Sequence, residues 1–183
     1  MLAPLLYTQN MACALTQGFT LGCKEDIGGI KSVRFAAYSD YIALGAVATT
    51  GQIASFATPT AVFRKYELTK EESMFSDDPT AGNRNGSLHY VPSLSFVLRK
   101  LDVAKRNEMQ LLAKNRVVAI IETNEATPSY WVAGYANGLD FATGTGSTGT
   151  AFADLNGYTM SFNGLEPNPM LAVPTALLAS ITA

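Results

Sequence analysis

The sequence comprises 183 residues, enough for one domain with a hydrophobic core; 48% are hydrophobic and only 15% are charged. This apolar composition excludes an ordinary disordered chain, and a net charge of −2 with a pI near 5.4 argues against a dedicated nucleic-acid-binding protein. With only two cysteines and one histidine, the chain has few residues that could form a metal site or a disulfide framework. Composition therefore predicts a β-leaning globular domain with few of the side chains that enzymes use for catalysis.

The first 23 residues carry no charge but do not read as a secretory signal, because the apolar residues 5–7 give way at once to polar residues 8–10. No window approaches the roughly 18 consecutive apolar residues that a membrane-spanning helix needs. We therefore expect no membrane contact and a chain that folds in the cytosol. Cys13 and Cys23 are then most simply reduced, buried residues, with a disulfide between them as the alternative.

The first half of the chain reads as strands separated by turns. β-branched or aromatic residues between glycine, serine, aspartate or proline predict strands over 31–38, 41–48 and 61–68. Residues 70–86 are rich in polar residues, and Asp78-Pro79 and Asn85-Gly86 are turn signals, so this segment is a long loop or an extended hairpin. Leu94, Phe96 and Leu98 then alternate with polar residues and predict a half-buried strand over 93–99.

One helix is predicted over 102–114, with Asp102 as its N-cap and an apolar side formed by Leu101, Ala104, Leu111 and Leu112. Short strands follow over 117–121, 130–135, 138–142 and 158–162; the second and third of these are predicted to meet in a hairpin at Asn137-Gly138. Together, the predicted strands and helix indicate a single mainly β domain over 1–183. It is a β-sandwich or barrel of about eight strands with one flanking helix.

Motifs that suggest chemistry each have a simpler interpretation. The glycines at 144–149 match the dinucleotide pattern G-x-G-x-x-G and Glu166 follows at the expected distance, but residues 151–156 are too few for the crossover helix, so a flexible loop is expected. His89 lacks an evident partner and reads as a strand or interface residue. Asp77 and Asp78 lack the ligand spacing of a calcium loop and read as a solvated turn. We expect no catalytic residue, no cofactor and no metal.

Charge is distributed unevenly along the chain. All 13 basic residues lie between Lys24 and Arg116, whereas the remainder of the chain carries only acids. These acids are Glu122, Glu125, Asp140, Asp154 and Glu166. A surface built from the C-terminal third is therefore neutral to negative, either an ordinary solvated face or an acidic wall that lets DNA slide where a basic wall would bind its phosphates.

The second half of the chain resembles the tail tube proteins of tailed bacteriophages. The resemblance rests on the order of a helix (100–116), a buried strand (117–122), the aromatic run YWVAGYANGL (130–139), a Gly/Ser/Thr loop and a closing strand pair introduced by D-x-N-G-Y-T (144–169). Residues 11–13 and 22–31 resemble the opening segment of related phage structural proteins more loosely. Residues 1–10 lie outside the pattern and are interpreted as an N-terminal extension.

The resemblance implies a fold similar to that of the secretion-system tube protein Hcp, in which six copies form a ring and rings stack into a tube. The partners would be further copies of the chain, the tape-measure protein, adjacent tail or neck proteins, and DNA passing without specific binding. Residues 70–86, with Asp77, Asp78 and Arg84, would be an inter-subunit loop, and 170–183 an interface arm or, alternatively, a buried closing strand. The acids that would face the channel are Glu122, Asp140 and Asp154.

The expected role is therefore a virion structural protein, not an enzyme, that is located in the phage tail after assembly in the host cytoplasm. Two alternatives remain. The chain could be another tube-fold virion component, such as a tail terminator, neck or distal-tail protein. It could also be a small β-barrel ligand-binding or enzymatic domain, which would have a closed apolar pocket and stay monomeric.

Overall fold

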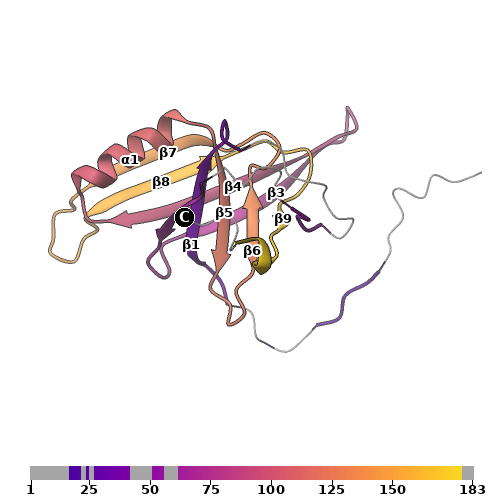
Figure 1. The fold of residues 1–183 in the computed structure, drawn as a ribbon, viewed down its shortest axis with the longest axis horizontal. Helices are drawn as coiled ribbons and strands as arrows, with labels where there is room; N and C mark the ends of the chain where they lie inside the picture. Colours follow the sequence, from indigo (N-terminus) through magenta and orange to yellow (C-terminus); the bar gives the residue numbers. More distant parts are fainter. Residues whose placement is uncertain (1–16, 22–23, 25–26, 42–50, 56–61, 179–183) are drawn as a thin grey trace, which may run out of the picture.

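Two antiparallel β-sheets form the domain in a computed structural model that describes residues 17–21, 24, 27–41, 51–55 and 62–178 (Figure 1). One sheet has the strand order β2-β1-β5-β6-β9 and the other the order β3-β4-β8-β7. The mainly β prediction is confirmed. The elements are β1 Ile30–Ala37, β2 Arg64–Glu67, β3 Met74–Gly82, β4 Ser87–Arg99, α1 Val103–Lys114, β5 Val117–Thr123, β6 Tyr130–Ala133, β7 Asp140–Ser147, β8 Gly157–Asn163, β9 Leu171–Ala172 and α2 Thr175–Leu178.

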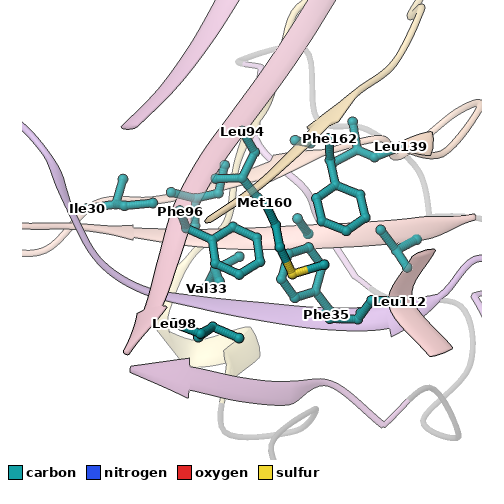
Figure 2. Close-up of a cluster of buried hydrophobic side chains, with 14 of the residues drawn as sticks. Ile30, Val33, Phe35, Leu94, Phe96, Leu98, Leu112, Leu139, Met160 and Phe162 are labelled. Carbon is teal, nitrogen blue, oxygen red and sulfur yellow. The ribbon is translucent and has the colours of Figure 1, made fainter. Parts of the chain in front are cut away.

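The sandwich core lies between the two sheets and follows the predicted alternation. Leu94 and Phe96 of β4 and Phe162 of β8 are fully buried there (Figure 2). The Phe35 ring of β1 lies 5.5 Å from each of the Phe96 and Phe162 rings, so the two sheets contact each other directly. These aromatic side chains supply much of the buried apolar area.

A second apolar cluster covers the other face of the five-stranded sheet. Every residue of β5 is buried, because Val118 and Ile120 face this second cluster while alternate residues face the sandwich core. Leu171 and Leu178 from the end of the described chain pack on it. Residues 170–178 therefore pack on the subunit, as the alternative of a buried closing strand expects, and the role of an interface arm stays a prediction; 179–183 lie outside the described residues.

Helix α1 begins where the sequence predicts, because the Asp102 carboxylate accepts a 3.4 Å hydrogen bond from the Ala104 N–H. Leu112 is the buried residue of this helix, whereas Leu111, which the periodicity assigned to the apolar side, is exposed. A groove separates the helix from β1 and β2, so only a narrow part of the helix surface packs against the core.

Asn137-Gly138 is not a hairpin turn. β6 belongs to the five-stranded sheet and β7 to the four-stranded sheet, so residues 134–139 carry the chain from one sheet to the other. Both Gly134 (φ +75°) and Gly138 (φ +81°) adopt the left-handed conformation that this crossing requires. An Asn-Gly pair permits a tight turn but does not determine whether the flanking strands pair with each other.

Two other local predictions are corrected. β7 continues through Ser147, so most of the expected flexible loop at 144–149 is strand; the glycines at 144 and 146 leave room for the rings of Phe141 and Tyr158, which lie where a Cβ would be. Asp78-Pro79 lies inside β3, which is possible because β3 is an edge strand. Of the strand predicted at 41–48, residues 42–48 lie outside the described residues.

Candidate assembly surface

The face of the four-stranded sheet that points away from the core is lined with hydroxyl groups. Hydroxyl side chains are paired directly across neighbouring strands at Ser76–Ser93, Ser95–Ser161, Thr143–Ser161 and Thr145–Thr159. The register places other side chains between these pairs on the same face, namely Met74, Asp78, His89, Val91, Val97, Arg99, Asn163 and Asp140. We call this surface the hydroxyl face. It consists of Ser76 and Thr80 on β3, Ser93 and Ser95 on β4, Thr159 and Ser161 on β8, and Thr143, Thr145 and Ser147 on β7.

Both edges of this sheet are long, and no other strand of the described residues pairs with them. β7 presents eight residues at one edge, and all of them from Ala142 to Ser147 are exposed. β3 presents nine residues at the other edge. Exposed edge strands of this length offer unpaired N–H and C=O groups to another strand.

The hydrogen bonds of Tyr90 reveal which backbone groups of β3 face outward. Tyr90 and Glu166 exchange backbone hydrogen bonds of 2.8 Å in both directions, so the N–H and C=O groups of Tyr90 point away from β3. Its partner Pro79 therefore forms a non-hydrogen-bonded pair and turns its own backbone groups to the open edge. Because proline has no N–H, a further strand would pair best with the part of β3 before Pro79.

Beyond the Tyr90–Glu166 bridge, β3 and β4 project as a two-stranded hairpin, visible at the upper right of Figure 1. The extended-hairpin interpretation of 70–86 is thus confirmed for its second part, and Asn85-Gly86 does form the turn, with Gly86 at φ +63°. Arg84 is exposed at the tip. Such a ribbon is marginally stable by itself, because within the described ranges each of its strands pairs only with the other.

The two aspartates predicted in this segment have different roles. Asp78 is exposed and accepts a 3.0 Å hydrogen bond from the Ser76 hydroxyl on the same face of β3. Asp77 points to the other face, where one carboxylate oxygen accepts a 2.7 Å hydrogen bond from the Met170 N–H. Its second oxygen is buried without a hydrogen-bond partner. Asp78 and Arg84 are therefore available to a partner, whereas Asp77 fixes the base of the hairpin.

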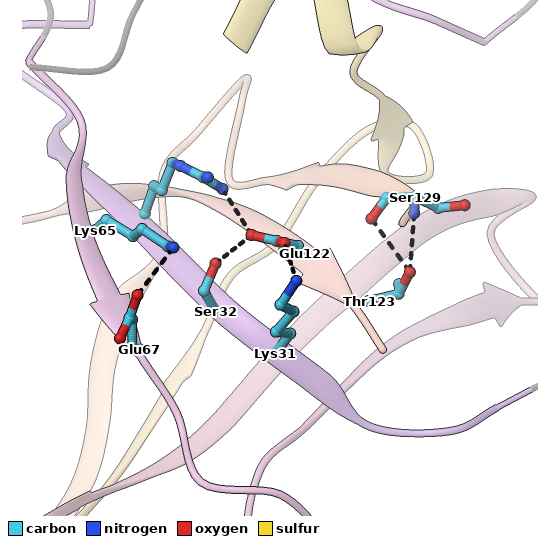
Figure 3. A network of polar contacts seen from close by, with 8 residues as sticks. Lys31, Ser32, Lys65, Glu67, Glu122, Thr123 and Ser129 are labelled. Carbon is cyan, nitrogen blue, oxygen red and sulfur yellow. Dashed lines mark hydrogen bonds and ion pairs between the residues drawn. The ribbon is translucent and has the colours of Figure 1, made fainter. Parts of the chain in front are cut away.

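Glu122, predicted as a channel-facing acid, is only 5% exposed and does not present a free carboxylate. On the outer face of the five-stranded sheet it accepts a 2.6 Å hydrogen bond from Ser32 and pairs with Lys31 at 3.3 Å and Arg34 at 3.4 Å (Figure 3). Although burial raises the pKa of Glu122, the hydrogen bonds from Ser32 and Lys31 and the charge of Arg34 lower it overall. The prediction is corrected: this acid is a buried structural ion.

The other two predicted acids are exposed. Asp140 lies at the start of β7, pairs with Arg116 at 3.3 Å and stands opposite Asn163 in the ladder. Asp154 lies in the loop between β7 and β8, where backbone hydrogen bonds from Ala151 and Thr150 lower its pKa. Asp140 thus borders the hydroxyl face, whereas Asp154 organises a loop.

Glu166 is a structural carboxylate, whereas the sequence suggested it as a cofactor-binding acid or as one of the acids of a negative surface. It is almost fully buried and accepts backbone hydrogen bonds from Ala136 (3.1 Å) and Asn137 (2.9 Å), so it fixes the crossing between the sheets. Burial raises its pKa, and the backbone hydrogen bonds only partly oppose this. No sequence signal identifies it, because the donors lie about 30 residues away.

Chemical sites remain unsupported in the part of the chain that the structure describes. No cluster of three His, Cys, Asp or Glu side chains there could hold a metal ion. His89 is half-buried in β4 opposite Thr80, as expected of a strand residue. None of the helices among the described residues has the length and apolar character to cross a membrane. Cys13 and Cys23, like residues 1–10, lie outside the described residues.

Comparison of the chain with protein-family models, with curated proteins and with solved structures gives no match.

Proposed function

We propose that the chain is a self-assembling structural subunit that forms the tail tube of a tailed bacteriophage, with no catalytic role. Two lines of support are independent of each other. One is the resemblance of residues 100–169 to tail tube proteins. The other, which carries the proposal, is the four-stranded sheet with its two long open edges.

The direction of the edge strands suits head-to-tail assembly. Each strand of the order β3-β4-β8-β7 is antiparallel to its neighbour, so β3 and β7 run in opposite directions. β7 of one copy next to β3 of another therefore continues the same antiparallel sheet. Such a contact joins two different surfaces, and repetition about an axis closes a ring.

The hydroxyl face then lines the inside of the ring. Its hydroxyl side chains, together with Asp78 and Asp140 on the same face, would provide few cations to neutralise phosphates, and cation contacts are what make non-specific DNA binding strong. Arg116, which borders this face, is already paired with Asp140, and Arg99 is paired with Glu72. DNA would pass such a wall without being held by it. The channel wall would thus combine hydroxyl groups with the exposed carboxylates of Asp78 and Asp140.

The projecting hairpin fits the same assembly. Among the described residues no third strand pairs with it beyond Tyr90, and Leu88 and Arg84 are exposed on it. Packing against a neighbouring subunit or ring would supply the support that the ribbon lacks. The hairpin is therefore the element that we assign to contacts beyond the sheet.

The first test is electron microscopy with light scattering on the purified chain. Hollow rings or tubes are expected. Discrete rings that never stack would favour the tail-terminator alternative over a tube subunit. A monomer that persists at high concentration would refute self-assembly.

Cysteine pairing tests the edges directly. In a background where Cys13 and Cys23 are serine, the single variants Thr145→Cys and Ser76→Cys are mixed and oxidised. Mixing excludes bonds within one subunit, so a disulfide between the two variants reports β7 beside β3 of another copy. The control Thr80→Cys lies on the same strand and face as Ser76 but beyond Pro79, and we expect it to pair poorly with Thr145→Cys. Equal pairing of both, or none, would contradict the proposed edge contact.

A further inference from the structure

The loop between β7 and β8 carries a solvent-exposed aromatic side chain on a backbone that hydrogen bonds hold in place. Asp154 accepts hydrogen bonds of 2.7 Å from the N–H groups of both Thr150 and Ala151, which closes residues 150–154 into a tight turn. Gly149 enters it at φ +67°, with Asp154 occupying the space where a Cβ would be. Phe152 stands on this turn and is fully exposed. The fold thus orders the loop without burying its aromatic ring.

A hollow of matching character lies at the start of β3. It measures about 520 Å³ and is bordered by Met74 and Ile27, which are 62% and 57% exposed, and by Gly28. A Cβ placed on Gly28 meets no atom within 4 Å, so open space surrounds this position. Lys70 also borders the hollow, and its ammonium could contact the face of an aromatic ring. Among the described residues, two exposed apolar side chains thus frame one side of an unfilled space, and the polar residues Glu71, Ser73 and Asn124 complete its lining.

The topology relates the loop to the hollow of another copy. Ser147 ends β7 in the ladder row of Gly157 and Arg99, at the same end of the sheet where Met74 begins β3. When β7 of one copy continues the sheet beside β3 of the next, the loop after Ser147 reaches the start of the neighbour's β3. That is the position of the hollow. The loop and the hollow therefore match in position, and the apolar side of the hollow, formed by Ile27 and Met74, suits an aromatic ring.

We infer that Phe152 is an anchor that inserts into the hollow formed by Ile27, Gly28 and Met74 in the adjacent copy of this chain. The inference rests on the proposed function and adds a specific contact to it. A single aromatic side chain in an apolar pocket at the centre of a contact commonly carries a large part of the binding free energy. Each copy would give one anchor and receive one, as a closed ring requires.

Two variants on opposite sides of the contact test the inference. Phe152→Ala removes the anchor, and Gly28→Leu adds a side chain to the hollow at a position where a Cβ meets no atom within 4 Å. We expect each to raise the protein concentration needed for ring formation at least tenfold, measured by light scattering and sedimentation. Phe152→Leu should restore part of the loss. The monomer's urea unfolding curve should stay unchanged for Phe152→Ala.

A matched control is Leu165→Ala, which removes another exposed apolar side chain, beyond the opposite end of β8. It should leave the assembly concentration unchanged. Mixed single variants Phe152→Cys and Ile27→Cys should form a disulfide with each other, and this bond can only join two copies.

The outcomes separate this inference from the proposed function. If the wild-type chain forms rings and Thr145→Cys pairs with Ser76→Cys, but Phe152→Ala and Gly28→Leu assemble normally, the anchor is refuted and the tube proposal survives. If the wild-type chain never assembles and neither cysteine pair forms, both are refuted. Loss of assembly in both variants, with the disulfide between Phe152→Cys and Ile27→Cys, establishes the anchor.

Discussion

Replacing Glu122 by alanine should destabilise the subunit by about 3 kcal/mol, because it leaves a buried cation without its counter-charge. The Arg34 side chain is only 10% exposed, and its Nε is already buried without a hydrogen-bond partner, so it cannot recover hydration when the carboxylate is removed. Ser32 also loses its acceptor. Lys31, with a side chain 60% exposed, turns to solvent and adds little.

Urea unfolding of the monomer, followed by the fluorescence of Trp131, the only tryptophan, measures this difference. The matched control is Asp140→Ala, which breaks the exposed pair with Arg116 and should cost no more than about 1 kcal/mol. Equal losses for the two variants, or a loss below about 1 kcal/mol for Glu122→Ala, would refute the assignment of Glu122 as a buried structural ion.

The same substitution has a pH signature. Because the folded state lowers the pKa of Glu122, its contribution is complete above pH 4.5, the ordinary pKa of glutamate, and is lost as the pH falls through the lowered value. The difference in unfolding free energy between wild type and Glu122→Ala should therefore shrink in acid. A difference that grows on acidification would contradict the ion-pair network.

Further predictions concern single positions. Glu166 should give the opposite pH dependence of the unfolding free energy. Because the folded state raises its pKa, the unfolding free energy falls as the pH rises from 4.5 through that raised value, and Glu166→Gln should remove this dependence from the urea unfolding curves. Gly157→Ala should cost more than about 3 kcal/mol or prevent folding, because its Cβ would clash with the β4 backbone, whereas Gly86→Ala, strained only by its positive φ, should cost about 1–2 kcal/mol. Leu94→Ala should lower the unfolding free energy by about 2–5 kcal/mol, while Leu88→Ala on the exposed hairpin should change it by less than about 0.5 kcal/mol.

Most elements could be predicted from the sequence because local patterns determine them. The alternation of Leu94, Phe96 and Leu98 reports one buried face of β4, and Asp102 marks the start of α1 through a capping bond to a residue two positions away. The uninterrupted apolar run at 117–121 reports a strand covered on both faces. In each case the cause lies within a few residues of the signal.

The roles of the acids could not be predicted, because burial depends on residues far along the chain. Glu122 meets Arg34 and Ser32, about 90 positions earlier, and Glu166 meets the backbone of a crossing 30 positions earlier. The sign of the charge is visible in the sequence. Whether a carboxylate reaches solvent or a buried cation is decided by the packing of distant strands.

From the sequence alone, most strands, the helix α1 and the alternation of serine or threonine with apolar residues in β4 and β8 could be predicted, but not the strand character of 74–82 or of 144–147. The tertiary structure was needed to show that hydroxyls of neighbouring strands pair on one face, that β7 joins them by crossing to the other sheet, and that no other described strand pairs with β3 or β7 at the sheet edges. The reason is that a strand's periodicity reports which side is buried, whereas register and neighbours depend on contacts between residues that are far apart in sequence.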